Sequence, residues 1–349
     1  MSSITLAGVT KHYGSVQVIQ TFNGVIGDGE FVTLLGPSGC GKTTMLRMIA
    51  GFEKPSSGEI RIGDDVVSGP GQFIPPNLRG IGMVFQTYAV WPHMNVFDNV
   101  AYPLKIQGVP RAEIKRLTGD MLESMHLGPY AKRLPCELSG GQQQRVALGR
   151  ALVSKPGVLL LDEPLSNLDA KLRESMRFEI KELQKKSGIT VVYVTHDQSE
   201  AMAMSDRIFV FHKGAVQQAD TPENIYNSPA NPFVADFVGK VNFLRGTAGD
   251  GSITFEGGQH MDYAGPRRGP VILAVRPENI SLRTGGGLLH GTLAHAYYLG
   301  DITDCRVMLD GSTGDAEIRI IAPGQSCGGI AAGTQVWLDF GRYLLFDGS

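Results

Sequence analysis

The 349-residue sequence lacks several features that would place it in a broad class of protein. No stretch approaches the roughly 18 consecutive apolar residues that a membrane-spanning helix needs. The N-terminus, MSSITLAGVTKHYG, has neither the basic region nor the long apolar run of a signal peptide. Charged residues amount to 19% and the net charge is −2, which gives no basic footprint for nucleic acid. Any role at a membrane must therefore come through a partner.

Cysteine is also scarce, and its spacing excludes two common uses. The four cysteines, Cys40, Cys136, Cys305 and Cys327, lie far apart without a C-x-x-C pair. This pattern provides neither a disulfide framework nor a zinc site, and it suits a reducing cytoplasm. Cys40 lies in a glycine-rich loop, where a lowered thiol pKa would make it reactive. We favour the simpler interpretation, a small side chain that fits.

Apolar residues are plentiful, at 42%, and the length predicts two or three domains. In the first two-thirds, short apolar runs alternate with helical patterns, which predicts a doubly wound, mostly parallel α/β sheet. Strands are expected at residues 30–35, 158–161, 189–195 and 207–211. One helix is expected at residues 42–50, closed by Gly51. Another carries an apolar stripe made of Leu172, Met176, Ile180 and Leu183.

Two other regions differ in texture. Residues 95–154 hold helical patterns and few strand signals, which predicts a helical subdomain inserted into the sheet domain. After Gly239, short β-like runs separated by glycine-rich turns predict a small all-β barrel or sandwich. The expected domains are therefore residues 1–238 and 239–349. The β-like runs lie at residues 252–255, 271–275, 291–299, 306–309, 317–321 and 335–339.

Residues 36–43, GPSGCGKT, fit the pattern G-x-x-x-x-G-K-[ST] between an expected strand and an expected helix. Glycines let successive backbone N–H groups converge on phosphate oxygens, and the helix N-terminus adds positive potential. Lys42 is expected to reach the β- and γ-phosphates and the Thr43 hydroxyl to ligate Mg²⁺. A chance glycine-rich loop is the alternative, and the flanking strand and helix argue against it. The expected ATP-binding residues here are Gly36, Ser38, Gly39, Cys40, Gly41, Lys42, Thr43 and Thr44.

Residues 158–163, VLLLDE, form an apolar strand that ends in two carboxylates. The strand carries Asp162 to the carboxyl edge of the sheet, where ligands bind in α/β folds. Asp162 is expected to hold Mg²⁺ through water, and Glu163 to orient or deprotonate the attacking water. Two solvated acids are the alternative for this pair taken alone, and the preceding phosphate loop makes it the lesser one.

Residues 138–142, LSGGQ, lie in the helical region. Taken alone they are a turn before a helix around residues 145–153, with Ser139 as N-cap, and such a helix start can accept a phosphate. Between the two nucleotide motifs, the segment resembles the signature of ABC ATPases. The resemblance implies an α/β P-loop NTPase fold, the ABC cassette with its helical subdomain. It also implies that Ser139, Gly140, Gly141 and Gln142 act in trans, on ATP held by the phosphate loop of a second copy.

The resemblance extends to shorter motifs. Gln86 corresponds to the Q-loop glutamine, which contacts Mg²⁺ and water and senses the transmembrane partner. Asp169 ends residues 166–169, which resemble the D-loop that communicates between the two subunits. His196 matches the switch histidine that contacts the γ-phosphate, and Tyr13 matches the aromatic that stacks on adenine. Tyr13 as an ordinary core aromatic and His196 as a plain strand-end histidine are the alternatives.

Residues 88–94, YAVWPHM, and residues 275–278, VRPE, resemble bacterial importers with a C-terminal TOBE-type, OB-like domain. This group takes up polyamines, ferric iron, phosphonates or sugars, and residues 88–94 favour the first three over sugars. The resemblance implies an ATPase motor with ATP and Mg²⁺ as cofactors, at the cytoplasmic face of the inner membrane. Its implied partners are a second copy, integral-membrane permease subunits and, indirectly, a solute-binding protein. The tail is expected to dimerise, and binding of a regulator is the open alternative.

Other classes of ABC ATPase are the competing functions. Those of DNA repair and chromosome structure carry long coiled coils between phosphate loop and signature, whereas residues 43–138 are short and lack sustained heptads. Ribosome-binding factors usually join two cassettes, and this chain has one phosphate loop. Exporter subunits fit residues 88–94 and the β-rich tail less well. The sequence therefore favours an importer motor without a nucleic-acid partner.

Overall fold

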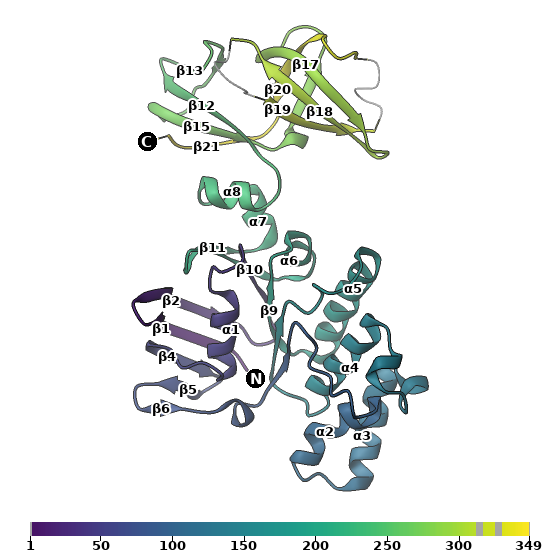
Figure 1. Ribbon diagram of the computed structural model, residues 1–349. Helices are drawn as coiled ribbons and strands as arrows, with labels where there is room; N and C mark the ends of the chain where they lie inside the picture. The colour runs from purple at the N-terminus through teal and green to yellow at the C-terminus, as the bar shows by residue number, and fades with distance from the viewer. Residues whose placement is uncertain (1, 312–316, 325–329, 349) are drawn as a thin grey trace. The chain divides into compact units, whose positions relative to one another are not determined.

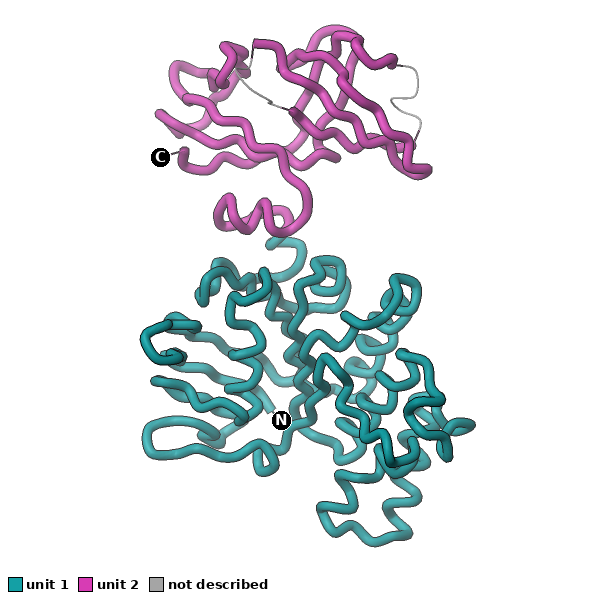
Figure 2. The backbone as a smooth tube through the Cα atoms, in the orientation of Figure 1, with its two compact units in different colours: residues 1–225 teal, residues 226–349 magenta. Residues whose placement is uncertain are grey.

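The computed structural model describes residues 2–311, 317–324 and 330–348, so Cys327 lies outside the described residues. Contacts divide the chain into two compact units, Met1–Ile225 and Tyr226–Ser349 (Figure 2). This division precedes the boundary at 238/239 that we expected between domains, which stays a prediction. Each unit is described below by itself.

Arg276 explains why the division falls early. Its guanidinium donates hydrogen bonds to the carbonyls of Tyr226, Ala235 and Lys240 at 2.8–3.1 Å. The segment that contains α8 (Pro232–Phe237) is thereby held by the second unit. Helix α7 (Pro222–Asn227) contains the point of division.

The first unit contains a mostly parallel sheet with the strand order β11-β10-β3-β9-β8-β7. Every neighbouring pair is parallel except β10 and β11. The strands expected at residues 30–35, 158–161, 189–195 and 207–211 are all present in it. The bounds are β3 Phe31–Leu35, β7 Ile81–Val84, β8 Val158–Asp162, β9 Thr190–Thr195, β10 Arg207–His212 and β11 Ala215–Asp220.

An antiparallel sheet with the order β2-β1-β4-β5-β6 forms the other layer of this unit. Sequence reasoning missed it. The register of β1 against β2 shifts three times between Leu6 and His12, and such bulges break the two-residue alternation by which strands are recognised. The bounds are β1 Ile4–Tyr13, β2 Val16–Ile26, β4 Ser57–Ile62, β5 Asp65–Gly69 and β6 Gln72–Phe73.

Helices cover both faces of the parallel sheet. The expected helix at residues 42–50 is α1, and Gly51 closes it in the left-handed conformation. The predicted helix around residues 145–153 begins earlier, at Gly140. The bounds are α1 Lys42–Ala50, α2 Val96–Ile106, α3 Arg111–Ser124, α4 Gly140–Leu152, α5 Ala170–Ser187 and α6 Gln198–Met204, with short 3₁₀ turns η1 Pro76–Leu78, η2 Gly128–Tyr130 and η3 Pro135–Glu137.

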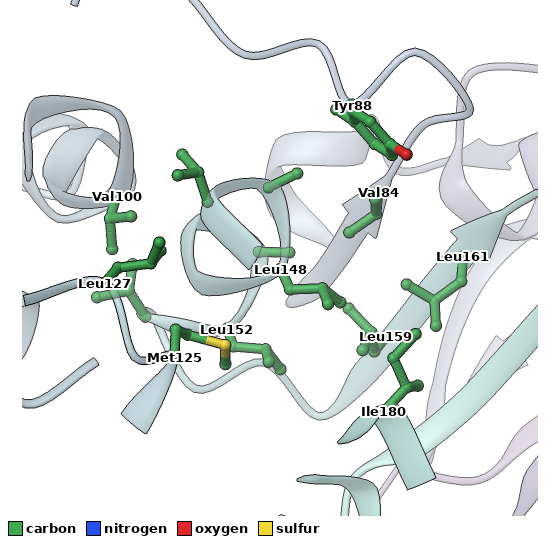
Figure 3. Packing of buried hydrophobic residues seen from close by; sticks show 14 of the residues in the cluster. Val84, Tyr88, Val100, Met125, Leu127, Leu148, Leu152, Leu159, Leu161 and Ile180 are labelled. Carbon is green, nitrogen blue, oxygen red and sulfur yellow. The ribbon is translucent and has the colours of Figure 1, made fainter. Parts of the chain in front are cut away.

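Alternate residues of β8 enter two different cores. Val158 and Leu160 pack with α1 and the antiparallel sheet, so that α1 lies between the two sheets (Figure 1). Leu159 and Leu161 pack on the opposite face, together with α4 and α5. In Figure 3 Leu148 of α4 lies between Val100 of α2 and Leu159. The helical region is therefore attached to the sheet through α4, whose first turn contains Gly140–Gln142 of the LSGGQ segment.

Among its described residues, the second unit is all β apart from the end of α7, α8 and η4 (Pro277–Asn279), as the glycine-separated runs predicted. Its two antiparallel sheets have the orders β14-β13-β12-β15-β21 and β16-β20-β17-β18-β19, and they share one apolar core. The bounds are β12 Asn242–Gly249, β13 Ser252–Phe255, β14 His260–Asp262, β15 Gly269–Val275, β16 Ile280–Arg283, β17 Leu289–Tyr298, β18 Ile302–Leu309, β19 Glu317–Pro323, β20 Gln335–Phe340 and β21 Tyr343–Asp347.

Candidate nucleotide site

The phosphate loop runs from the end of β3 to the start of α1. Gly39 and Gly41 have φ angles of 77° and 106°, which glycine alone adopts without strain. A Cβ at Gly36 would lie 2.4 Å from the Phe211 carbonyl oxygen, so that position also excludes a side chain. The exposed tip formed by Ser38 and Gly39 is open, and nothing lies within 4 Å of a Cβ built at Gly39.

Lys42 is buried, and its ammonium turns back onto the loop. Its Nζ donates to the carbonyls of Gly36 at 2.8 Å and Pro37 at 2.9 Å, and Cys40 Sγ lies 3.8 Å away. Burial raises the pKa of the Cys40 thiol above its ordinary value, although Lys42 opposes the rise. Cys40 is thus a small buried thiol and not an activated thiolate. Thr44 follows, half-buried, on the first turn of α1.

Thr43 and Asp162 meet at the carboxyl edge of the sheet. The Thr43 hydroxyl donates to Asp162 Oδ1 at 3.0 Å. Asp162 is only 7% exposed, and burial raises the pKa of its carboxyl while the Thr43 bond opposes the rise. The pair presents a hydroxyl and a carboxylate, the hard oxygen ligands that Mg²⁺ takes together with substrate phosphates.

Glu163 is the residue on which the site converges. Gln86 Nε2 donates to Glu163 Oε2 at 3.2 Å, and His196 Nδ1 lies 3.3 Å from the same oxygen. Residues from the ends of β7, β8 and β9 are brought together here, across 77 residues of sequence between Gln86 and Glu163. The alternative of two solvated acids is therefore excluded for Glu163, because its carboxylate has specific partners.

The backbone of Glu163 is strained. Its φ of 44° is left-handed, which is unusual for a residue other than glycine. Three bonds hold it: Glu163 N donates to the Val194 carbonyl at 3.0 Å, and Ser166 donates to the Glu163 carbonyl from N and Oγ at 3.3 and 2.9 Å. Asn167 Nδ2 also donates to the Gln86 carbonyl at 2.8 Å, which joins the two loops.

The LSGGQ segment is a helix start. Ser139 is the N-cap of α4 in a capping box, with Gln142 N donating to Ser139 Oγ at 3.4 Å and Ser139 N to Gln142 Oε1 at 2.9 Å. A Cβ at Gly141 would lie 2.8 Å from Leu172, and one at Gly140 would lie 3.3 Å from Leu168. Within the described residues, no hydrogen bond or ion pair joins this segment to the phosphate loop of the same chain.

The remaining predicted residues lie on the surface. Tyr13 is 46% exposed, which excludes the core-aromatic alternative, and Lys11 Nζ lies 4.7 Å from its ring centroid. His196 follows β9 with a 56% exposed side chain, and its contact with Glu163 distinguishes it from a plain strand-end histidine. Asp169 caps α5 by accepting from Leu172 N at 3.0 Å.

Sequence reasoning missed Arg150, which shapes the segment after Gln86. Arg150 is 9% exposed and donates to the carbonyls of Tyr88 at 2.8 Å and Ala89 at 2.7 Å. Both of those residues have left-handed φ angles, 60° and 47°. The guanidinium also stacks on the Trp91 ring at 4.4 Å. No local sequence signal marks Arg150, because its partners lie about 60 residues earlier.

Comparison with known proteins decides the family. The ABC transporter profile matches residues 19–166, and the TOBE domain profile matches residues 273–345. The sn-glycerol-3-phosphate import ATP-binding protein of Ruegeria pomeroyi is 46% identical over 326 residues, 93% of this chain and 91% of that protein. The chain belongs to the ATP-binding subunits of ABC import systems.

Further similarities agree with this family. The trehalose/maltose import ATP-binding protein of Thermococcus litoralis is 50% identical over 80% of this chain and 79% of its own length. The spermidine/putrescine import ATP-binding protein of Thermobifida fusca is 46% identical, covering 97% and 91%. A dimeric structure of a bacterial ABC transporter cassette aligns with a TM-score of 0.57 and 34% identity over 63% of this chain and 98% of that chain.

The chain consists of an ABC cassette and a TOBE domain, and as a member of this family it is an ATPase that powers import. It binds ATP. Action on nucleic acid or ribosomes, the alternative drawn from the sequence, has no support among these relatives. Within the described residues no helix combines the length and apolarity needed to cross a membrane.

Proposed function

We propose that the carboxyl edge of the parallel sheet is the hydrolytic centre of an import motor, with Glu163 at its middle. The observation that carries this is the convergence of Gln86 and His196 on one oxygen of Glu163. The Thr43–Asp162 pair beside it supports the same assignment. No single motif supports a nucleophile-orienting role by itself, whereas the contacts of Gln86 and His196 with Glu163 support it together.

The phosphate loop binds the triphosphate. The open tip leaves Ser38 and Gly39 free to approach phosphates, and the backbone N–H groups of residues 38–39 and 41–44 supply donors. Lys42 then exchanges the carbonyls of Gly36 and Pro37 for β- and γ-phosphate oxygens. Thr44 adds a further hydroxyl donor, and exposed Tyr13 stacks on the adenine.

Thr43, Asp162 and Gln86 are the residues that would hold Mg²⁺. Their oxygens suit that ion, and the buried Asp162 carboxylate lacks a cationic side chain within ion-pair distance among the described residues. When bound, Mg²⁺ neutralises charge on the phosphates. Glu163 orients and deprotonates the attacking water, and His196 contacts the γ-phosphate from the opposite loop.

A second copy completes the site. Ser139, Gly140, Gly141 and Gln142 have no bond to their own phosphate loop, which supports action in trans on a partner's ATP. The exposed Asp169 lies in the segment that faces such a partner. A twofold interface uses the same patches on both chains, so one sequence supplies both halves. The dimeric cassette similar to this chain supports the arrangement.

The transport partners follow from the relatives. Import requires integral-membrane permease subunits, which Gln86 and residues 87–94 would contact, and indirectly a solute-binding protein. The cassette then works at the cytoplasmic face of the inner membrane. Residues 1–238 form the motor and residues 239–349 the TOBE-type domain that dimerises. Relatives at 46–50% identity are named for the import of sn-glycerol-3-phosphate, trehalose/maltose and spermidine/putrescine. Because similar cassettes serve different solutes, the cargo is chosen outside the cassette.

The test is Glu163→Gln in the full chain. Removing the general base should lower ATP hydrolysis by about 10²–10⁴-fold while ATP still binds. Turnover and equilibrium nucleotide binding are measured on the same preparation. Glu182→Gln, an exposed glutamate of α5, is the matched control and should hydrolyse ATP normally. Wild-type hydrolysis by Glu163→Gln with normal binding would contradict the assignment.

A further inference from the structure

Arg173 of α5 lies between two loops of the nucleotide site. On one side, its Nη2 donates to the carbonyl of Leu168 at 3.0 Å, within the D-loop segment 166–169. On the other side, its Nη1 lies 3.5 Å from Asp197 Oδ2 and its Nε lies 3.9 Å from Glu200 Oε1. One guanidinium thus faces both the segment expected to meet a second copy and the segment that carries His196.

The neighbours of His196 are held by Glu200. The Glu200 side chain is 3% exposed, and its Oε2 accepts from Tyr193 Oη and from Thr195 Oγ1, both at 2.7 Å. Asp197 N donates to Thr195 Oγ1 at 2.9 Å, and Asp197 Oδ1 accepts from Glu200 N at 3.2 Å. The residues before and after His196 therefore belong to one hydrogen-bonded cluster around a buried carboxyl group.

Arg173 is also tied to the D-loop through its own helix. Asp169 caps α5, accepting from Leu172 N through its side chain and from Arg173 N through its carbonyl. A displacement of segment 166–169 would therefore move the start of α5 together with Arg173. Arg177 is the other arginine of α5, and it does not make this double connection. Within the described part of the chain, its side chain lies at hydrogen-bond distance from Ser199 alone.

The Nε–H of Arg173 is buried and has no acceptor. Its nearest candidate is Glu200 Oε1 at 3.9 Å, about one ångström longer than a typical N–H···O hydrogen bond. A buried donor without a partner costs free energy that a small shift would recover. Arg173 Nε and Glu200 Oε1 are therefore not hydrogen-bonded in this structure, and a small shift of either side chain would bring them together.

We propose that Arg173 is a positioning residue that transmits movement of the D-loop to His196 by closing on Glu200. The inference rests on the proposed role of His196 in hydrolysis. Arginine is needed because its planar fork reaches Leu168, Asp197 and Glu200 at once, whereas a lysine ammonium is a single point of contact. The expected signature is lost turnover with intact ATP binding, since no atom of Arg173 lies in the phosphate loop.

The experiment compares full-length Arg173→Lys and Arg173→Ala with the control Arg177→Ala, one helical turn further along α5. We expect both Arg173 variants to lose about tenfold in kcat, with the KM for ATP unchanged and the chain still folded at the assay temperature. Arg177→Ala should keep the wild-type kcat. An unchanged kcat in Arg173→Lys, a loss shared by Arg177→Ala, or a parallel change in KM and unfolding would overturn the proposal.

A double-mutant cycle tests whether Arg173 acts through His196 or only stabilises the surrounding structure. In the His196→Ala background, measured under single-turnover conditions with enzyme in excess, Arg173→Lys should cause no further loss of rate. If Arg173 acted independently of His196, the two losses would multiply. Failure of the proposed function is visible separately, since wild-type chain would then hydrolyse no ATP, or Glu163→Gln would hydrolyse it normally.

Discussion

The glycines of this chain have different structural roles, and the space around each Cα shows whether a side chain could fit there. Gly36 and Gly41 allow the phosphate loop to exist. Gly149, inside α4, does not need to be glycine: a Cβ there would lie 3.4 Å from Met121 and 3.5 Å from Val100, which is ordinary contact. Gly82 in β7 is the opposite case, since its Cβ would lie 2.4 Å from the Ala151 carbonyl oxygen.

This contrast gives a stability prediction. Gly149→Ala should raise the free energy of unfolding by about 0.5–1 kcal/mol, because glycine costs that much within a helix. Gly82→Ala should lower it by about 1–3 kcal/mol through overpacking. Urea unfolding of the full chain measures both. A lower unfolding midpoint for Gly149→Ala would show that the space beside α4 is smaller than the structure indicates.

At the scale of elements, the segment after β7 depends on α4. Tyr88 and Ala89 adopt left-handed backbone conformations with their carbonyls on Arg150. Asn99 of α2 adds to this by donating to the carbonyls of Trp91 at 3.1 Å and Met94 at 3.0 Å. Residues 88–94, the expected contact of the permease, are thereby shaped by the helical region.

Arg150→Met should therefore loosen that segment. Loss of the guanidinium leaves the buried carbonyl of Tyr88 without its donor, which costs about 1–3 kcal/mol of unfolding free energy. Hydrogen exchange of residues 88–91 should speed up relative to wild type, and urea unfolding reports the stability. Arg116→Met, an exposed arginine of α3 with a 63% exposed side chain, is the control and should change neither. Unchanged exchange in Arg150→Met would rule out the positioning by Arg150.

In the second unit, Tyr226 of α7 donates a hydrogen bond to Glu278 of η4. Burial, this bond and the charge of Glu278 raise the pKa of Tyr226 to about 12, above the usual 10.0. The folded state thus favours neutral tyrosine. The stabilisation is complete below the unfolded pKa of about 10 and is lost as the pH rises toward 12.

Tyr226→Phe should remove that pH dependence. Between pH 9 and 11 the wild-type chain should lose more unfolding free energy than the variant, because the variant cannot ionise at this position. Denaturant unfolding at the two values measures the difference. Equal losses in both proteins would mean that Tyr226 ionises in the folded state as freely as in the unfolded one.

At the scale of the whole molecule, one chain holds half of each proposed ATP site. Lys42→Ala disables the phosphate loop, and Ser139→Arg disables the signature. Each variant alone should be inactive. In an equal mixture, half of the dimers are mixed and each has one complete site of two, so about one quarter of wild-type activity should return. ATPase assays before and after mixing test this. No recovery would indicate that Ser139 does not act on a partner's ATP.

The contiguous motifs were readable from the sequence for a local reason. A phosphate loop, a capping box and an apolar strand ending in acids each depend on neighbouring residues, so GPSGCGKT, LSGGQ and VLLLDE predicted their own backbone geometry. The parallel strands could be predicted because both faces are buried and the apolar runs are unbroken. β1 and β2 could not, because their bulges erase the alternation.

Tertiary structure alone decided which side chains meet. Gln86 and His196 share one oxygen of Glu163 only because β7, β8 and β9 are neighbours in the sheet. Arg150 and Arg173 carry no sequence signal, since a guanidinium finds its carbonyl and carboxylate partners through the packing of helices on that sheet. The sequence by itself determined the family, whose ATPase domain binds ATP, and it predicted the phosphate loop that would hold the nucleotide. The order of the strands decided which loops meet at the carboxyl edge of the sheet. It therefore decided which side chains of those loops contact one another.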